Sequence, residues 1–169
     1  MMVREASYSQ AEAVYELHEQ ARAVYRRALI DKWSDGHPDF DDVFGDIDDG
    51  ICYTVEENRV IAAFVLDFSG DTSYRAGGGC SWPAGEYAVL HHMSVSADCD
   101  LAEVIDAVVD FCTRRCAENG VDSIRCGAHP KELAVCDALI KCGFENCGRF
   151  RTPTGEERSA YCKVINGEE

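Results

Sequence analysis

Two adjacent histidines, His91 and His92, lie within an apolar segment of the chain. The ordinary pKa of a histidine side chain, about 6.5, suits it to remove a proton from a reacting group near neutral pH. Neighbouring side chains of a regular strand point to opposite faces of the sheet. If this segment is a regular strand, only one of the two rings can therefore serve a given site, and the alternative role for either is that of a hydrogen-bonded core residue.

The histidines belong to a longer stretch, residues 86–105, that reads as a strand, a short polar turn and the start of a helix. The N–H groups at such a helix N-terminus can bind an anion such as phosphate. The turn carries Asp98, Asp100 and Glu103. A like-charge contact at about 4 Å costs roughly 1 kcal/mol in water. The helix dipole stabilises an anion at the N-terminus by typically less than about 1 kcal/mol per charge. The acidic turn is therefore a poor phosphate site, and its alternative role is to cap the helix without a ligand.

The chain has 169 residues and a formal net charge of −15 at pH 7. This length predicts one domain, over residues 1–169. Such acidity argues against a nucleic-acid partner, which needs a basic surface. It favours a cationic partner such as an amine, although acidity is also a common solubility trait.

No apolar run reaches the length that spans a membrane, and the N-terminal residues lack the apolar core of a secretion signal. We therefore expect a cytoplasmic protein without a membrane partner. The 10 cysteines include no C-x-x-C pair, and most fall within apolar periodic segments. We expect free, mostly buried thiols and no metal site.

The elements that position these residues follow from apolar periodicity and turn residues. Ser7 and Gln10 match a capping box before a helix that we expect to end near Lys32. Residues 69–85 have no periodicity and form a long loop. The expected strands are residues 3–4, 51–55, 59–68, 86–96, 123–127, 145–150 and 158–165, and the expected helices follow Ser7, Pro38, Asp100 and Pro130. This order combines antiparallel hairpins with one βαβ crossover, which predicts an α+β domain with helices on both faces of a mixed sheet.

Three segments carry a resemblance to a known family. They are LHHMSV at residues 90–95, SIRCGAHP with the following helix and KCGFENCGRF at residues 123–150, and RSAYCK at residues 158–163. In this order and spacing the chain resembles the GNAT superfamily of acyl-CoA-dependent N-acyltransferases, from its first strand to Ile165. The resemblance implies the GNAT-like acyltransferase fold, with about seven strands, and an acetyl-CoA donor.

The resemblance also implies where the donor binds. The family's fourth and fifth strands part, the pantetheine arm pairs with the exposed edge of the fourth, and the diphosphate lies on the following helix N-terminus. Carried onto this chain, the cofactor-binding candidates are Met93, Ser94, Val95, Asp100, Leu101, Ala102, Glu103, Val104, Ile105 and His129. For His129, which ends the fifth strand, the alternative is a helix-capping or pre-proline role.

The chain departs from the family at the diphosphate turn, whose usual pattern is R-x-x-G-x-G. The matching positions here are Asp100, Glu103 and Ile105, with Leu101 where a further glycine is common. Side chains at the glycine positions stand where backbone should approach a phosphate. A rotated turn that binds the arm more weakly, or a donor that lacks the phosphates of CoA, remains open.

The resemblance assigns the base as well. His91 matches the strand position at which the arylalkylamine N-acetyltransferases, a branch of the superfamily, use a histidine, so we favour His91 over His92. The family's acid, a tyrosine of the fourth helix, is replaced by Leu139, which leaves Tyr87, Glu86 and Tyr161 as candidates.

The acceptor pocket of the family is formed by two loops, which here contain Trp33, Tyr74, Arg75 and Trp82. Loop aromatics and overall acidity suit an amine. We therefore expect an N-acetyltransferase that acts on a small amine or an amino terminus, and a homodimer is common in the superfamily. The alternative is a GNAT-fold protein that has lost efficient acetyl-CoA binding and serves as a ligand-binding or interaction module.

Overall fold

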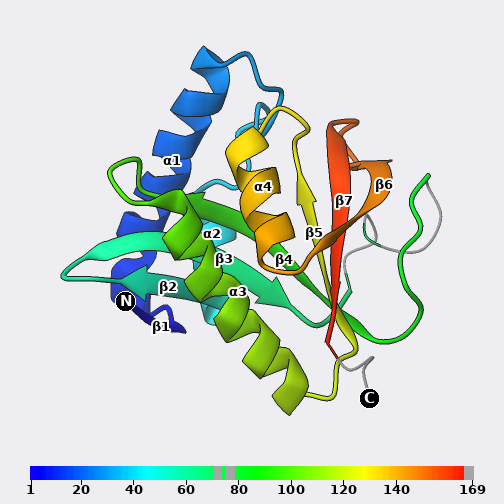
Figure 1. Ribbon diagram of the computed structural model, residues 1–169. Helices are drawn as coiled ribbons and strands as arrows, with labels where there is room; N and C mark the ends of the chain where they lie inside the picture. Colours follow the sequence, from blue (N-terminus) through cyan, green and yellow to red (C-terminus); the bar gives the residue numbers. More distant parts are fainter. Residues whose placement is uncertain (71–73, 75–78, 166–169) are drawn as a thin grey trace.

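A computed structural model describes residues 1–70, 74 and 79–165. The described residues form one seven-stranded sheet in the order β1-β2-β3-β4-β5-β7-β6. Its strands are β1 (Met2–Glu5), β2 (Cys52–Glu56), β3 (Val60–Asp67), β4 (Tyr87–Val95), β5 (Ser123–Ala128), β6 (Glu145–Arg151) and β7 (Glu157–Val164). Figure 1 shows that the sheet is open and twisted.

The helices of the described ranges are α1 (Ala11–Arg27), α2 (Phe40–Asp48), α3 (Leu101–Glu118) and α4 (Leu133–Lys141), with a single 3-10 turn, Tyr8–Gln10, before α1. Helices α1 and α2 contact one another and strands β2 to β4, while α3 and α4 cover the other face (Figure 1). Strands β4 and β5 are parallel and joined by α3, and the other neighbouring strands are antiparallel. The predicted α+β architecture with one βαβ crossover is confirmed.

The first helix begins as predicted and ends earlier than predicted. Gln10 closes the capping box by accepting the Ser7 N–H at 3.0 Å. The helix stops at Arg27, because Leu29 adopts a left-handed conformation with φ 58° and the Ile30 N–H returns to the Tyr25 carbonyl at 2.9 Å. This is the hydrogen bond of a Schellman motif, in which glycine usually occupies the left-handed position. The chain has no glycine at this position to mark the C-terminus of the helix, so the expected end near Lys32 is wrong.

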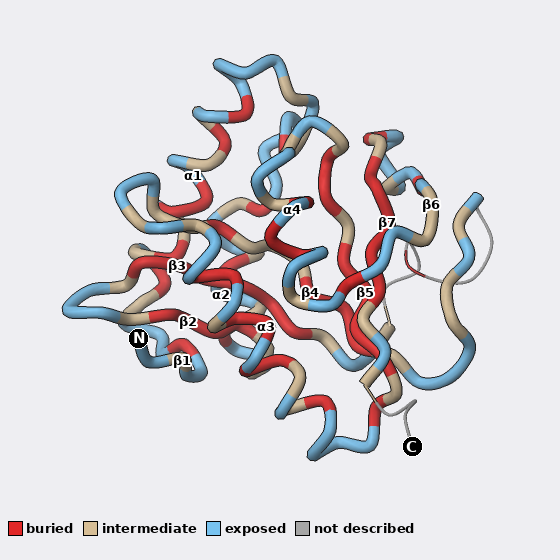
Figure 2. The backbone as a smooth tube through the Cα atoms, in the orientation of Figure 1, coloured by how far each residue is buried: buried red, intermediate tan, exposed pale blue. Residues whose placement is uncertain are grey.

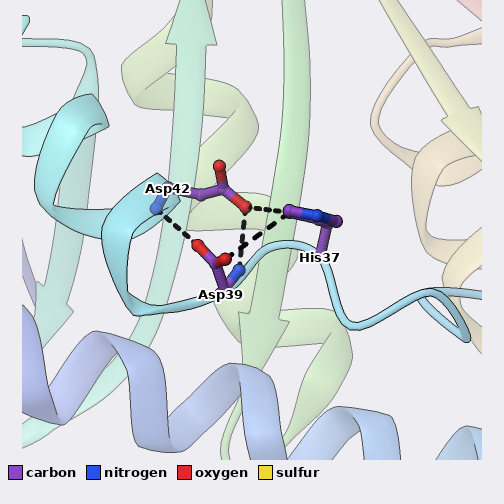
Figure 3. Close-up of side chains that lie close together, drawn as sticks. All are labelled: His37, Asp39 and Asp42. Atoms are coloured by element: carbon purple, nitrogen blue, oxygen red, sulfur yellow. Dashed lines mark hydrogen bonds and ion pairs between the residues drawn. The ribbon is translucent and has the colours of Figure 1, made fainter.

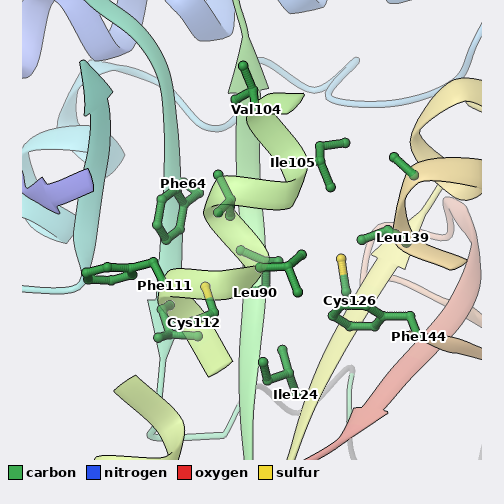
Figure 4. Packing of buried hydrophobic residues seen from close by; sticks show 14 of the residues in the cluster. Phe64, Leu90, Val104, Ile105, Phe111, Cys112, Ile124, Cys126, Leu139 and Phe144 are labelled. Carbon is green, nitrogen blue, oxygen red and sulfur yellow. The ribbon is translucent and has the colours of Figure 1, made fainter. Parts of the chain in front are cut away.

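The core of the described residues has two main parts, one on each face of the sheet, and a small third cluster around Tyr74, Val89, Phe150 and Ala160. The larger part joins the sheet to α3 and α4 and contains Phe64, Leu90, Ile105 and Leu139, each fully buried (Figure 4). The smaller part joins α1 and α2 to the opposite face. The buried segments of β3 to β5 run through the centre of the molecule in Figure 2. Strand β3 is buried over residues 61–66, as expected of an apolar strand covered on both faces.

The middle of β4 is irregular in two ways that matter for function. Its pairing with β3 contains a bulge, since Ala63 pairs with Ser94 but Val65 pairs with His91. The extra residue is His92, whose φ is 49°. Pairing with β5 ends at Leu90 and Cys126, so the rest of β4 has no partner on that side and the two strands diverge (Figure 1).

The burial of Ile105 yields a stability prediction. Ile105→Ala removes fully buried atoms from the α3 core and should lower the free energy of unfolding by about 2–5 kcal/mol, measured by urea denaturation. Ile140→Ala, at a side chain that is 52% exposed, is the control and should cost much less. Equal losses would mean that Ile105 does not pack as described.

Candidate active site

A cavity of about 730 Å³ opens where β4 leaves β5. One wall is the unpaired segment of β4, and other walls come from the end of α1, the β4–α3 turn, the start of α4 and the β6–β7 turn. The residues that line the cavity include Tyr25, Lys32, Trp33, Tyr74, His91, His92, Met93, Ser94, Val95, Cys99, Leu101, Glu132, Val135, Glu156 and Arg158. A concave site with apolar walls and a few converging polar groups is typical of a small-molecule site.

Both histidines of β4 line this cavity, and their ring centroids are 4.4 Å apart. The expectation that His92 faces away from His91 is wrong, because the bulge interrupts the strand alternation on which it depended. The His92 Nδ1 lies 3.5 Å from the Asp46 carboxylate of α2, and the two side chains are 29% and 23% exposed. Asp46 is a residue that the sequence reasoning missed, since nothing in the sequence brings α2 to the centre of β4.

His91 has a different environment. Its Nε2 atom is buried and has no hydrogen-bond partner among the described residues; the His92 Nδ1 also lacks a hydrogen bond there, but it lies near the Asp46 carboxylate. Burial, followed by repulsion from His92, lowers the pKa of His91 to about 3. The ring is therefore neutral at pH 7, and in the unliganded protein it is a weak base.

A third histidine supports the strand from the α1 side. The His18 ring is 2% exposed, and its Nδ1 lies 2.6 Å from the Ser94 hydroxyl. Burial is also the main reason why the pKa of His18 falls to about 3. The rings of His18 and His92 each contact Trp33 edge-on, at centroid distances of 5.2 and 6.2 Å. These contacts fix the bulged segment of β4 against α1.

The cavity also contains two ion pairs that the sequence did not reveal. Lys32 Nζ lies 2.8 Å from the Glu132 carboxylate, with side chains 12% and 7% exposed, and Arg158 pairs with Glu156. Burial disfavours the charged form of both members of the first pair, but their mutual attraction outweighs it, so the pKa of Lys32 is raised and that of Glu132 lowered. Glu132 also accepts the His129 N–H at 2.9 Å. The pair thus ties the loop after α1 to the turn before α4.

The predicted cofactor residues divide into two groups. Met93, Ser94, Val95 and Leu101 line the cavity, as a site along β4 requires. The other predicted residues of α3, Ala102, Glu103, Val104 and Ile105, do not line it, and neither does its N-cap residue Asp100. Val104 and Ile105 are fully buried in the α3 core, so their side chains pack inside the protein and do not face the cavity.

The remaining acid and cofactor candidates lie outside the cavity lining. Glu86 and Tyr87 are at the opposite end of β4, where the Tyr87 ring covers the Arg125 guanidinium at 3.7 Å. Tyr161 is buried on β7, and burial is the first cause that raises its pKa to about 12. His129 accepts the Lys131 N–H at 3.0 Å, so it stabilises the turn before α4. The structure therefore does not bring these four residues together with His91.

The aromatic acceptor candidates are also divided. Trp33 and Tyr74 line the cavity and are buried. Trp82 packs outside the lining, with its ring centroid 6.0 Å from that of Tyr74. Arg75 lies outside the described residues.

Within the described residues, one group has the composition of a metal site, and it consists of His37, Asp39 and Asp42 (Figure 3). Hydrogen bonds among these residues account for the arrangement. Asp39 accepts the Asp42 N–H at 2.8 Å and Asp42 accepts the Asp39 N–H at 2.9 Å, which caps α2, while His37 Nδ1 lies 2.6 Å from the Asp42 carboxylate.

In the part of the chain that the structure describes, no helix is long and apolar enough to cross a membrane.

The buried histidines predict how stability depends on pH. The unfolded chain protonates His18 below about pH 6.5, whereas the native protein keeps it neutral down to about pH 3. The free energy of unfolding should therefore fall with falling pH, by up to about 1.4 kcal/mol per pH unit for this residue. His18→Asn, which keeps a partner for Ser94 but cannot titrate, should show a flatter decline between pH 7 and 5 in urea titrations. Parallel declines would contradict the burial of a neutral His18.

The architecture was compared with those of known proteins. No protein-family model and no curated protein sequence matches the chain. Solved structures do match. A GNAT-family acetyltransferase of Streptococcus agalactiae has a TM-score of 0.80 and 22% identity, with 99% of this chain and 96% of that one covered.

Two further matches have lower identity. A GNAT-family acetyltransferase of Listeria monocytogenes has a TM-score of 0.70 and 17% identity, covering 97% of this chain and 94% of that one. A Salmonella typhimurium protein described as an acetyltransferase, solved with its cofactor acetyl-CoA, has a TM-score of 0.71 and 12% identity, covering 100% and 96%. The chain therefore has the fold of the GNAT-family acetyltransferases.

Proposed function

We propose that the protein is an N-acyltransferase, which transfers an acetyl group from a thioester donor to the amine of a small molecule or an amino terminus. The observation that carries this proposal is the cavity at the parting of β4 and β5, into which a bulge brings two histidine rings. The fold supports it, because the structures that match the whole chain are described as acetyltransferases.

The unpaired edge of β4 is suited to hold an extended acyl-thioester arm. An extended ligand can add to an open strand edge through main-chain hydrogen bonds, and pairing with β5 ends at Leu90. Met93, Val95 and Leu101 offer apolar contacts along the same path. The pantetheine part of acetyl-CoA fits these residues. Its diphosphate does not fit the acidic first turn of α3, and the transfer of the acetyl group does not require the diphosphate.

The bulge residue His92 is the better-supported general base in this geometry. A base must reach the amine proton and must be held in one orientation. The Asp46 carboxylate lies beside His92 Nδ1, which leaves Nε2 as the nitrogen that takes the proton. His91, the residue favoured from the sequence, lies beside it but has no charged partner except the neighbouring ring. The amine nitrogen then attacks the thioester carbon, the C–S bond breaks as the amide bond forms, and the departing thiolate takes up the proton that His92 removed from the amine or a proton from solvent.

The acceptor would lie between these histidines and the far end of the cavity. Trp33 and Tyr25 line the cavity there, but the Lys32 ammonium already lies 5.4 and 5.1 Å from the centroids of their rings, so they would contact the acceptor mainly as apolar walls. The net charge of −15 would draw a cationic amine toward the protein. A small molecule with a free amine, or a flexible amino terminus, fits a cavity of about 730 Å³.

The activity can be tested with a panel of acceptors and two donors. Purified protein is incubated with acetyl-CoA or with S-acetyl-pantetheine, and with an arylalkylamine, a polyamine, a free amino acid or a short peptide. Mass spectrometry of the acetylated amine is the readout, because the 10 cysteines of the chain would react with thiol reagents. Acetylation above the protein-free rate is expected for at least one acceptor. If neither donor supports it, a ligand-binding or interaction role is favoured instead.

The base can be identified with matched single variants. His92→Asn should lower kcat by about 10²–10⁴-fold and remove the acid limb of the pH–rate profile. Asp46→Asn should lower kcat by roughly tenfold or more, because it releases the orientation of the ring.

His91→Asn is the matched control, since it alters the adjacent ring and leaves the pair of His92 and Asp46 intact. It should retain most of the activity. If His91→Asn instead abolishes turnover and His92→Asn does not, the base is His91.

A further inference from the structure

We propose that the protein selects an acyl donor with a phosphate-free, pantetheine-type arm, and that the first turn of α3 rejects the diphosphate of CoA. This inference rests on the proposed acyl transfer and specifies its donor. It follows from how the described residues at this helix N-terminus use their N–H groups, charges and side chains.

One of the N–H groups that would hold a diphosphate, that of Glu103, is already engaged. The Asp100 carboxylate accepts the Glu103 N–H at 3.2 Å, and the Asp100 carbonyl accepts the Val104 N–H at 3.1 Å. The carboxylate therefore occupies the position of the anion that this helix end could otherwise bind. A diphosphate would have to displace Asp100 and then face its charge together with that of Glu103.

The nearby cation is engaged as well. Arg59 Nη2 lies 2.6 and 2.8 Å from the two oxygens of Asp98, and the Ser96 hydroxyl donates to the same carboxylate at 2.7 Å. Farther along the cavity, Lys32 and Arg158 are paired with buried carboxylates. These three cations neutralise acidic side chains of the chain itself, whereas Lys131, which also lines the cavity, donates to the Leu29 carbonyl at 3.5 Å.

The helix also cannot move aside to make room. Val104 and Ile105 are both 0% exposed, in the core between α3 and the sheet. A shift of the first turn would pull these side chains out of close packing. Leu101, at one of the family's glycine positions, fills the cavity wall with its side chain.

The same end of the cavity does suit an uncharged arm. Cys99, Leu101 and Val135 form apolar walls beside the open edge of β4. The arm of pantetheine consists of amides, methylenes and a gem-dimethyl group, which can pair with a strand edge and pack on such walls. The arm can therefore bind while the phosphates of CoA are disfavoured.

Binding can be measured by titration calorimetry with three thiols, which are pantetheine, 4′-phosphopantetheine and CoA. Pantetheine should bind at least tenfold more tightly than CoA, and phosphopantetheine should lie between them. Added salt screens repulsion between charges. The affinity for CoA should therefore rise between 20 and 300 mM salt, by about threefold or more, while that for pantetheine stays constant.

Variants of the turn provide the matched test. Asp100→Asn with Glu103→Gln removes two charges and keeps a capping side chain at position 100, so it should tighten CoA binding about tenfold and leave pantetheine unchanged. Glu103→Gly with Asp100→Arg should tighten it further. The control is Glu12→Gln with Glu16→Gln, two exposed carboxylates of α1 outside the cavity lining, and it should change neither affinity.

The outcomes separate this inference from the proposed function. Tighter binding of CoA than of pantetheine, weakened by salt, overturns the inference and leaves acyl transfer standing. Tight pantetheine binding without any acylated amine in the acceptor panel supports the donor selection and overturns the proposed transfer. Failure of all three thiols to bind at millimolar concentration overturns both.

Discussion

The cavity depends on one interruption of the sheet, which is the loss of pairing between β4 and β5 beyond Leu90 and Cys126. A strand with an open edge in the middle of a sheet would expose backbone N–H and C=O groups that must find partners. The chain keeps the two strands together at one end and separates them at the other. The wedge between them offers both an open strand edge and walls around it.

The bulge at His92 lies on the β3 side of the same strand, and it changes which side chains the strand presents to the cavity. An extra residue in β4 breaks the alternation of faces, so the rings of His91 and His92 lie side by side. The environment then distinguishes them. The His92 Nδ1 lies 3.5 Å from the Asp46 carboxylate without a hydrogen bond, whereas the His91 Nε2 is buried and has no hydrogen-bond partner among the described residues. Two chemically identical side chains thus acquire different properties from the residues that α1 and α2 place around them.

Much of the fold could be predicted from the sequence, because apolar periodicity and capping residues are local signals. Such signals predicted the capping box at Ser7, the apolar strand β3 and the crossover from β4 to β5. The early end of α1 was not, since Leu29 occupies a position that glycine usually marks.

The site was less predictable, because its parts meet only through the fold. Lys32 and Glu132 are 100 residues apart in the chain, and Asp46 reaches His92 from a different element. A regular strand was the natural assumption for residues 86–96, and the bulge that overturns it has no sequence signal of its own. The burial of Val104 and Ile105 was equally hard to foresee, since a match to a family turn says nothing about which side of the helix faces the core.

The acidic turn shows that helix stability and anion binding compete for the same groups. A helix N-terminus has a few unpaired N–H groups, and either a side chain or a ligand can satisfy them. Here the Asp100 carboxylate satisfies one of them within the chain, and Arg59 is held by Asp98. One N–H group of the turn is therefore satisfied without a ligand, and a diphosphate would have to compete with the Asp100 carboxylate for it. What the fold retains for a donor is the part of the site that depends on backbone and shape, namely the open edge of β4 and the apolar walls beside it.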